Sequence, residues 1–597
     1  MSEPFPQYGW SGKILRADLS TGELTELRLP EGVYRAFLGG KGLGGWLLRQ
    51  SVLEHGPLPC EDPRTPLVLA VGPLNATIAP TSGRAHFVTR SPLTGAVGDA
   101  SAGGRLGTEL RRAGWDAVLI VGRAERPVGI EIDDGKAVLA DASHFSGRDA
   151  GEVFAALKEK RGGGSFVATG PAAENGCLFS GLMVDGRHAA GRCGLGRVAA
   201  LKNLKYLAVR GAGKARVADL PALKTAREDI LRLTAASPAL MGQHGFSCFG
   251  TGSIFDLMDS RRMMPTDNFS RTRFDRAEGL NAHAYKERYG PRRHGCQGCH
   301  VLCKKIADDG RTMPEFETMS HFTALIGNTD MELVLAANDL CNRLGIDTIS
   351  AGVTLACHRE ISGEELTGAR VLELLEDIGL GRGIGAELGL GSAKYAELKG
   401  RPELSMSVKG LELPAYDPRG AYGMALGYAT ATRGGCHLRA YPISHEILRK
   451  PVATDRFSFS GKARMIKIAE DVNAVVDSLI ACKFLFFAAT LEEYARAFSA
   501  VTGVSATAQD LLAVGERVDY QERLLNAAYG FSSAQDDLPA RFFSEPGSGD
   551  ATLAVPPVPR QDFLNARAAY YRIRGLTEGG LPTRERAEKL GLVWGEQ

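Results

Sequence analysis

The sequence predicts an α+β protein, with a β-rich N-terminal domain over residues 1–212 and two mainly helical domains over residues 213–415 and 416–597. Two observations support this fold class. Up to Gly211, short apolar runs alternate with turn residues, which is typical of strands. After Gly211, apolar residues recur every three or four positions, which is typical of helices with one buried face. The chain of 597 residues is also too long for a single hydrophobic core.

Two hairpins and several single strands are expected in the first domain. The first hairpin pairs residues 13–19 with residues 24–29 across a Ser-Thr-Gly-Glu turn. The second hairpin covers residues 129–139 and contains Asp-Gly, a favoured turn between antiparallel strands. A single helix is expected over residues 32–50. Further strands are expected at residues 66–71, 85–90, 117–121, 165–169 and 206–210.

Amphipathic helices are expected in the rest of the chain, because apolar residues there follow the helical period. They cover residues 223–234, 331–343, 367–378 and 510–528. The boundary between the two helical domains is placed at Asp417-Pro-Arg-Gly420, where proline and glycine interrupt the pattern.

The composition argues against several classes of protein. The formal net charge is +2 and no long basic run occurs, so no nucleic-acid partner is expected. The first residues contain acids and prolines but no apolar core of a signal peptide. The most apolar stretch, residues 478–490, carries Lys483 and is too short to span a bilayer. The 11 cysteines are therefore expected as free or metal-bound thiols of a cytoplasmic protein.

Four cysteines have the spacing of ligands to an inorganic cluster. Cys296, Cys299 and Cys303 lie within eight residues, and Cys482 lies far downstream. A compact run plus one distant cysteine is a common way to hold a [4Fe-4S] cluster. A zinc ion and plain buried thiols are the alternatives, although zinc sites usually combine two CxxC pairs and this chain has one.

Two glycine-rich loops of the first domain each carry an arginine. Arg84 ends the segment 72–84, and Arg192 lies in the segment 191–197. Glycines let backbone N–H groups approach a phosphate, and arginine supplies a forked positive charge, so these loops indicate an anionic ligand. Ordinary turns between strands are the alternative. Neither loop matches a Walker A motif or a dinucleotide fingerprint.

Four further segments contain residues suited to proton transfer or ligand binding. Glu317 follows the cysteine run, and His437 lies within the segment 433–439. A histidine exchanges protons near neutral pH, and a buried glutamate has a raised pKa. A solvated glutamate and a packed histidine remain open alternatives. The segments 342–347 and 477–482 share one outline, and each can present a carboxylate and loop amides to a polar ligand.

Taken in order, these segments resemble the aldehyde ferredoxin oxidoreductase family of tungsten enzymes. The resemblance covers nearly the whole chain and is more specific than any single motif. It rests on Gly9–Arg16, Leu38–Gly44, Gly72–Gly104, Gly191–Gly196, Cys296–Cys303, Pro314–Thr318, Leu344–Ser350, Asp417–Gly420, Tyr428–Arg439 and Asp477–Phe484.

The resemblance implies a tungsten ion bound by two molybdopterin molecules beside one [4Fe-4S] cluster, with Mg²⁺ bridging the pterin phosphates. The β-rich domain would hold this cofactor beneath the helical domains. The residues implied to bind pterin, its phosphates or the magnesium are Arg84, Ser101, Gly103, Arg192, Cys193, Gly196, Asn342, Gly345, Ile346, Asp347, Arg433, Arg439, Asp477 and Ala481. The implied cluster ligands are Cys296, Cys299, Cys303 and Cys482, and the implied acid/base residues are Glu317 and His437.

The chain departs from the family pattern at three places. Asn342 opens the first pterin loop in place of an aspartate, and an amide cannot match the charge-assisted hydrogen bond of a carboxylate. Ile480-Ala481 replaces Gly-Leu in the second loop, and Arg439 stands where some members have lysine, which keeps the charge. No ligands for an inter-subunit iron are recognisable, and the sequence does not distinguish tungsten from molybdenum.

The implied reaction is the oxidation of an aldehyde to a carboxylic acid, with electrons leaving through the cluster. His437 would donate to the aldehyde oxygen, and Glu317 would take a proton from water or substrate. No flavin or nicotinamide motif is present, so the electron acceptor would be ferredoxin or a dedicated iron–sulfur or flavin subunit. An oligomer is compatible with the sequence.

Two alternative functions remain open at this stage. One is the catalytic subunit of a related low-potential reductase that dearomatises an aryl thioester. The other is a non-catalytic iron–sulfur or zinc subunit. The presence of both Glu317 and His437 favours aldehyde chemistry over the reductase.

Overall fold

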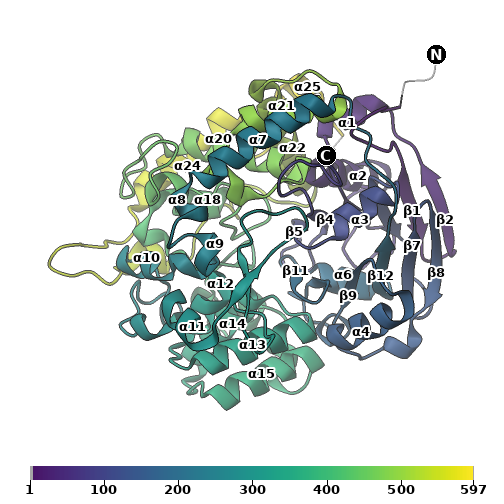
Figure 1. The fold of residues 1–597 in the computed structure, drawn as a ribbon. Coiled ribbons are helices and arrows are strands. Elements are labelled where there is room, and N and C mark those ends of the chain that lie inside the picture. Colours follow the sequence, from purple (N-terminus) through teal and green to yellow (C-terminus); the bar gives the residue numbers. More distant parts are fainter. Residues whose placement is uncertain (1–4, 596–597) are drawn as a thin grey trace.

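The computed structural model describes residues 5–595 and confirms the α+β class (Figure 1). The β-rich part, purple to blue in Figure 1, forms one side of the molecule, and helices coloured teal to yellow form the other side. Within residues 5–595, no helix combines the length and the apolar character that a membrane span requires.

The first sheet has the strand order β2-β1-β6-β3-β4-β5. Its strands are β1 (Ile14–Asp18), β2 (Glu23–Leu27), β3 (Leu67–Ala70), β4 (Ala85–Arg90), β5 (Val97–Ala102) and β6 (Ala117–Val121). β1 pairs antiparallel with β2, which confirms the first predicted hairpin, and parallel with β6. The edge strand β5, which was not predicted, carries Asp99 and Ser101.

The second sheet has the strand order β11-β10-β9-β12-β7-β8. Its strands are β7 (Val128–Asp133), β8 (Lys136–Asp141), β9 (Ser165–Thr169), β10 (Leu182–Val184), β11 (His188–Ala190) and β12 (Leu204–Arg210). β7 and β8 pair antiparallel, which confirms the second predicted hairpin. Leu69 and Phe87 of the first sheet share one apolar core with Ile130 and Leu207 of the second, so side chains of the two sheets pack together.

Two short hairpins lie outside this domain. One pairs β13 (Arg292–His294) with β14 (Lys304–Ile306) and encloses the cysteine run. The other pairs β15 (Ser407–Val408) with β16 (Leu411–Glu412). Neither was predicted, because strands of two or three residues are too short for a periodic signal.

The single helix predicted over residues 32–50 is wrong, because the structure has two helices there. They are α1 (Glu31–Phe37) and α2 (Gly40–His55). The chain turns at Leu38, which has a φ of 63°. A Cβ at Gly40 would lie 2.6 Å from Ile480 Cδ1, so the start of α2 is pressed against a distant loop. Local periodicity does not encode such a long-range contact.

The four helices predicted in the rest of the chain are confirmed. They are α7 (Leu220–Ala235), α13 (Met331–Leu344), α15 (Gly368–Leu380) and α22 (Ala508–Ala528). Other long helices are α4 (Ala150–Arg161), α14 (Thr348–Ser362), α18 (Tyr422–Thr430), α20 (Lys462–Leu479), α21 (Leu491–Thr502) and α24 (Arg560–Arg574). Shorter helices include α3 (Leu106–Arg112), α6 (Leu195–Leu201), α11 (Ala282–Tyr289), α12 (Phe316–His321), α17 (Ser392–Leu398) and α25 (Arg584–Lys589).

A second and larger apolar core joins the helices to the β-rich part. Leu43 and Leu47 of α2 share this core with Val475 of α20 and Leu525 of α22. The contact places the C-terminal end of α20 against the N-terminal domain. The predicted domain boundaries stay predictions.

Candidate active site

Glu317 and His437 meet in the interior of the molecule. Glu317 lies in the first turn of α12, and His437 lies in the segment that follows α18. His437 Nε2 is 3.5 Å from Glu317 Oε1. The backbone N–H of Ala415 donates a hydrogen bond to Glu317 Oε2 at 2.8 Å. Two residues singled out separately in the sequence therefore form one pair.

Burial determines the protonation of this pair. It raises the pKa of Glu317 to about 8. Burial also lowers the pKa of His437 well below its usual range, and the charges of Arg192 and Arg433 add to that effect. At neutral pH, Glu317 therefore holds a proton and His437 is uncharged. Among the described residues, Glu317 Oε1 and His437 Nδ1 have no hydrogen-bond partner, which suits contact with a ligand.

Aromatic rings surround His437. The ring centroid of Tyr416 is 5.3 Å from that of His437, and the centroid of Tyr441 is 5.8 Å away. Phe316 packs on Tyr416, and Phe487 packs on Tyr441. These rings were not predicted as site residues, because nothing in the local sequence pattern distinguishes them from ordinary core residues. They supply the apolar environment that shifts the pKa of the pair.

Arg192 and Asp347 join two of the predicted pterin-binding segments, residues 191–197 and 342–347. Arg192 Nε is 3.0 Å from Asp347 Oδ2, and Arg192 Nη2 donates to the carbonyl oxygen of Glu412 at 2.6 Å. Asp347 also caps α14 by accepting a hydrogen bond from the N–H of Ile349 at 3.1 Å. A glycine-rich loop of the sheets and a helix-capping loop thus meet at one ion pair.

The neighbouring predicted residues lie at the same junction. The N–H of Gly181 donates to the carbonyl oxygen of Gly345 at 2.9 Å. Ile346 forms a β-bridge with Ser180, and the N–H of Gly196 donates to the Ser180 carbonyl at 2.9 Å. Asn342, at the departure from the family pattern, is half-buried in the last turn of α13.

Asp99 binds the two predicted arginines of the second half of the chain, Arg433 and Arg439. Arg439 donates to both carboxylate oxygens of Asp99, at 2.6 and 2.9 Å. Arg433 Nη1 donates to the Asp99 carbonyl oxygen at 2.5 Å, and His86 Nε2 lies 2.8 Å from the carboxylate. Burial opposes ionisation, but the charges of Arg439, Lys41 and Arg433 outweigh it and hold the pKa of Asp99 well below its usual range.

Other predicted residues gather on or beside β5. Arg84 Nε donates to Ser101 Oγ at 3.0 Å, and Arg84 Nη2 donates to the Ser101 carbonyl oxygen at 2.7 Å. A Cβ at Gly103 would lie 2.6 Å from Cys296 Sγ, so the cysteine run comes very close to this strand. Cys193 has a φ of 68° and is buried next to the same strand.

The four predicted cluster ligands come from two parts of the chain. Cys296, Cys299 and Cys303 lie between β13 and β14, and Cys482 lies beyond the end of α20. Burial raises the pKa of the Cys482 thiol to about 11, and the charges of Cys299 and Cys296 contribute. Burial also raises the pKa of Cys303 well above its usual range, and Cys482 contributes. The thiols therefore lie within range of one another's charges.

Backbone hydrogen bonds fix the cysteine loop to the N-terminal domain. The N–H of Gln297 donates to the carbonyl oxygen of Gly104 at 3.0 Å. The N–H of Thr81 donates to the carbonyl oxygen of Gly298 at 3.1 Å. Thr81 belongs to the glycine-rich loop 72–84 that was predicted to bind an anion, and Gly104 ends the Gly72–Gly104 segment of the family resemblance.

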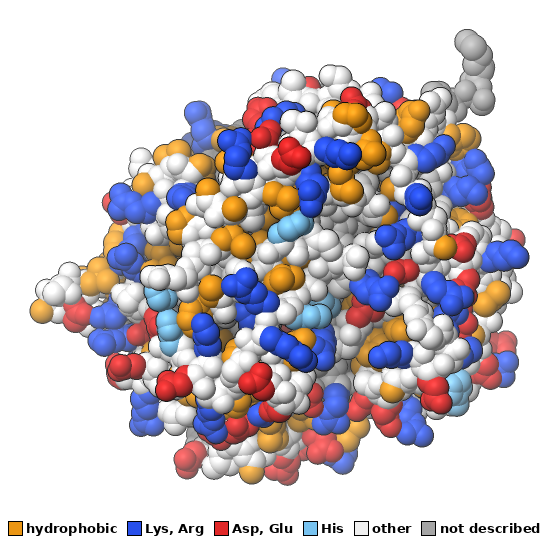
Figure 2. All heavy atoms as spheres, viewed as in Figure 1, with side chains coloured by type: hydrophobic (Ala, Val, Ile, Leu, Met, Phe, Trp, Pro, Cys, Tyr) orange, Lys and Arg blue, Asp and Glu red, His pale blue; other side chains and the backbone are white. Residues whose placement is uncertain are grey.

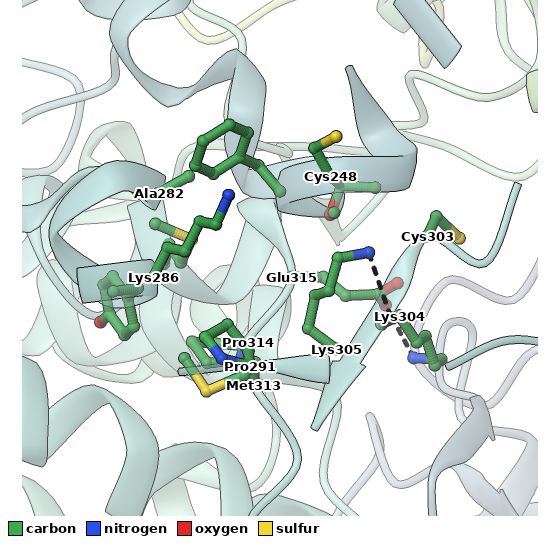
Figure 3. Close-up of a pocket in the computed structure, with 15 residues that line it drawn as sticks. Cys248, Ala282, Lys286, Pro291, Cys303, Lys304, Lys305, Met313, Pro314 and Glu315 are labelled. Carbon is green, nitrogen blue, oxygen red and sulfur yellow. Dashed lines mark hydrogen bonds and ion pairs between the residues drawn. The ribbon is translucent and has the colours of Figure 1, made fainter. Parts of the chain in front are cut away.

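An ion pair connects the cysteine loop to the helix that carries Glu317. Figure 3 shows Cys303, Lys304, Lys305 and Glu315 around a small hollow beside the loop. Lys304 Nζ is 3.3 Å from Glu315 Oε2. Glu315 is the residue that precedes α12. The ion pair places the end of the cysteine loop next to the start of the helix that carries Glu317.

The Asp477–Cys482 segment is the C-terminal cap of α20. Lys483 Nζ is 2.7 Å from Asp477 Oδ2, and the N–H of Ala481 donates to the Val476 carbonyl at 3.0 Å. Ile480 has a φ of 60°. A left-handed backbone costs an L-residue about 1–2 kcal/mol, so this loop is strained where the family pattern has glycine.

The side chains present fit an anionic cofactor. Six buried or half-buried cations lie in this region: Arg84, Arg192, Arg433, Arg439, Lys41 and Lys483. Arg433 Nε is buried without a hydrogen-bond partner among the described residues. A Cβ at Gly103 or Gly196 would collide with its surroundings, so the loops are packed as closely as glycine allows. Among residues 5–595, no group of three or more His, Cys, Asp or Glu side chains has the arrangement of a metal-ion site.

Three charged residues of this region were missed as functional residues. Lys41 Nζ is 2.8 Å from Glu522 Oε1, and Lys41 also faces Asp99 at 3.9 Å. Lys41 lies in the Leu38–Gly44 segment of the family resemblance, but its residue type alone does not mark it as functional. Asp99 and Glu522 carry no local signal, because a single acid in a strand or helix is usually a surface charge.

The first domain has two sheets whose glycine loops and arginines suit an anion. The helices joined to it bury Glu317 beside His437. This architecture is that of a cofactor-dependent oxidoreductase. The chain belongs to the aldehyde ferredoxin oxidoreductase family. Residues 14–211 match the family's N-terminal domain, and residues 225–592 match its domains 2 and 3. The resemblance noted in the sequence is therefore confirmed.

Two relatives extend over almost the whole chain. The tungsten-containing aldehyde ferredoxin oxidoreductase of Pyrococcus furiosus is 37% identical and that of Thermococcus kodakarensis is 36% identical, each over 98% of this chain and 99% of the relative. Among solved structures, the active-site complex BamBC of benzoyl coenzyme A reductase superposes with a TM-score of 0.83. That match covers 98% of this chain and 97% of the other at 20% identity, so it supports the fold alone.

Proposed function

We propose that this chain oxidises aldehydes to carboxylic acids at a tungsten centre held by two molybdopterin molecules, with molybdenum as the alternative metal. The observation that carries this proposal is the identity of 36% and 37% to tungsten-containing aldehyde ferredoxin oxidoreductases over 98% of this chain. When bound, the cofactor would supply the two-electron redox chemistry that amino-acid side chains lack.

The same proposal assigns the cofactor-binding residues. Guanidinium groups and closely packed glycine loops suit pterin phosphates bridged by Mg²⁺. The assigned residues are Arg84, Ser101, Gly103, Arg192, Cys193, Gly196, Asn342, Gly345, Ile346, Asp347, Arg433, Arg439, Asp477 and Ala481. The interior cations among and beside these residues favour a ligand with several negative charges.

Glu317 and His437 are assigned to proton transfer. Overall, an aldehyde and water give a carboxylic acid, two protons and two electrons. Protonated Glu317 donates a hydrogen bond to the aldehyde oxygen, which makes the carbonyl carbon more electrophilic. Neutral His437 accepts a proton from the attacking water. These roles reverse those that the family resemblance implied, because burial raises the pKa of Glu317 to about 8 and lowers that of His437.

One [4Fe-4S] cluster is assigned to Cys296, Cys299, Cys303 and Cys482. The support is their spacing in the sequence and the effect of their charges on one another's pKa values. Cys482 also ends the segment that begins at Asp477, so one loop would contact both the pterin and the cluster. Such a loop shortens the path of an electron from substrate to surface.

The electron acceptor is proposed to be an acidic protein, either ferredoxin or a dedicated iron–sulfur or flavin subunit. Lys and Arg side chains surround the centre of the face shown in Figure 2. Arg292 and Arg293 are exposed on β13, and burial together with the nearby charge of Arg187 lowers the pKa of His294. These three arginines form no ion pair with a carboxylate in the described part of the chain. Unpaired positive charge beside the cysteine loop suits a partner of opposite charge.

Metal analysis of protein purified without oxygen tests the proposal. We expect near-stoichiometric tungsten or molybdenum and about four irons per chain, as one [4Fe-4S] cluster requires. Benzaldehyde should be oxidised with a viologen dye as acceptor, and a benzoyl thioester should not be reduced. Zinc without tungsten or molybdenum, or turnover of the thioester alone, would contradict the proposal.

Replacement of one cysteine tests the cluster separately. Cys299→Ala should abolish the cluster signal in electron paramagnetic resonance and lower the iron content. Cys60→Ala removes a buried thiol outside the loop and serves as the matched control. A normal signal in Cys299→Ala would remove Cys299 from the ligand set.

A further inference from the structure

A second cleft lies in the N-terminal part of the molecule and contains none of the residues assigned to the cofactor or the substrate. Its volume is about 320 Å³, which is within the range of small-molecule pockets. Its walls come from the segment around Trp10, the C-terminal end of α3, the turn between β7 and β8, and the linker at residues 213–216. Elements far apart in the sequence thus share one concave surface.

The lining of this cleft is positively charged. Its charged lining residues are Lys13, Arg111, Arg112, Lys214 and Arg216, and no Asp or Glu is part of the wall. Lys13 pairs with Glu26 at 2.9 Å, and Arg111 binds Asp116. Within residues 5–595, Arg112, Lys214 and Arg216 form no ion pair with a carboxylate. Three cations of the cleft therefore lack a counter-charge.

Arg111 adds a buried cation at the base of the cleft. Arg111 is only 5% exposed to solvent. Its Nε is buried without a hydrogen-bond partner among the described residues. Burial lowers the pKa of Arg111, and the charge of Arg216 lowers it further. Positive charge concentrated in a partly enclosed space is unfavourable unless an anion shares it.

The walls are held in place by backbone contacts. The N–H of Gly9 donates to the carbonyl oxygen of Arg216 at 3.0 Å. The N–H of Gly213 donates to the carbonyl oxygen of Arg112 at 3.2 Å. The linker cations are thus fixed against the end of α3. Arg111 and Arg112 lie in the last turn of α3, where positive side chains offset the negative end of the helix dipole. This effect does not explain the two cations from the linker.

We propose that this cleft is a binding site for a small multivalent anion, a diphosphate or a polycarboxylate, that bridges α3 and the linker at residues 213–216. A multivalent ligand is required because three cations without counter-charge come from two separate elements. Binding would tie the β-rich part to the first helix of the helical part, α7, which follows the linker.

Titration calorimetry on the purified holoenzyme tests this site with two probes, inorganic pyrophosphate and citrate, at constant ionic strength. We expect one saturable event per chain for at least one probe, and the probe that binds identifies the anion class. Lys214→Ala combined with Arg216→Ala should weaken that event about tenfold, the effect of losing roughly 1.4 kcal/mol of binding. Arg126→Ala combined with Lys158→Ala removes two exposed cations elsewhere in the domain and should leave binding unchanged.

Tryptophan fluorescence gives an independent reading of the same site. Trp10 and Trp115 line the cleft and are two of the 4 tryptophans in the chain. Pyrophosphate or citrate should therefore change the emission in wild type and in the Arg126/Lys158 control, but not at the same concentration in the linker variant. Absence of binding by both probes, or equal weakening in both double variants, would overturn the proposal.

Discussion

Glu317 and His437 are 3.5 Å apart, and the chemistry that we assign to them requires both. Glu317→Gln keeps a hydrogen-bonding group but cannot exchange a proton, and His437→Asn cannot accept one. Each variant is expected to lower kcat about 10²- to 10⁴-fold, as the loss of a general acid or base does. The tungsten or molybdenum and iron contents should be unchanged, because neither side chain is assigned to the cofactor or cluster.

Steady-state kinetics with benzaldehyde and metal analysis of the same preparations check this expectation. Glu365→Gln, which changes an exposed glutamate, is the matched control. A near-normal rate in either variant would remove that residue from the proton-transfer pair.

The raised pKa of Glu317 also has a measurable effect on stability. The folded pKa is about 8 and the ordinary value is 4.5, so between these limits the folded state holds a proton that the unfolded state has released. Stability contributed by this group is therefore lost as pH rises through that interval. The Glu317→Gln variant has no such proton to release and does not lose this stability. The difference between its thermal midpoint and that of wild type should therefore increase from pH 5 to pH 8. A pH-independent difference between the two proteins would show that the carboxyl pKa is not raised.

At this scale, the sequence predicted reacting side chains better than their electrostatic partners. Glu317, His437, Arg433 and Arg439 were all recognisable from motifs. Asp99, which binds both arginines, was not, because its role depends on tertiary contacts. The protonation states of the pair were also unpredictable, since they depend on burial.

The break between α1 and α2 exists because α2 begins against the loop that ends α20. A Cβ at Gly40 would lie 2.6 Å from Ile480 Cδ1, and the φ of Gly40 is 39°. Gly40→Ala should destabilise the protein by about 1–3 kcal/mol, as overpacking does. It should also lower the iron content, because the displaced loop carries Cys482.

Gly32→Ala is the matched control, since it makes the same change in α1, where a Cβ meets nothing within 4 Å. This control should be neutral or stabilise the protein by up to about 1 kcal/mol, as an alanine in a helix does. Thermal unfolding and iron analysis of both variants provide the comparison. Equal behaviour of the two would show that the α2–α20 contact is not tight.

Local patterns predicted elements where periodicity or turn chemistry was strong. Both hairpins of the first domain and the four later helices were predicted, with ends within a few residues. The edge strand β5 and the hairpin around the cysteine run were missed. β5 has the sequence Val-Gly-Asp-Ala-Ser-Ala, which lacks the apolar alternation of a typical strand.

The distribution of charge over the whole surface bears on the electron acceptor. Arg292→Glu combined with Arg293→Glu should raise the KM for an oxidised ferredoxin at least about tenfold at low salt, because like charges would then meet at the contact. Activity with a neutral dye should not change, and the difference from wild type should shrink as ionic strength rises.

Arg126→Glu combined with Lys158→Glu makes the same change of charge away from the cysteine loop. Its KM for ferredoxin should stay close to that of wild type. If both double variants respond equally, net charge rather than this arginine group determines the effect.

For the whole molecule, the order of motifs along the chain was the most informative signal. It led to the family, which full-length matches confirm. The order of motifs did not predict that β5, α2 and the end of α20 lie together, because local patterns do not encode contacts between residues so far apart in the sequence.

The hydrogen bond from the N–H of Gly42 to Ser478 Oγ spans 436 positions. The N-terminal sheets leave the ribosome long before their partner α20 is synthesised. The contact between α2 and α20 is therefore absent throughout most of translation. A prosthetic group held by segments on both sides of this contact is expected to be inserted only after residue 478 has been synthesised, and chains that end before it are expected not to retain the group.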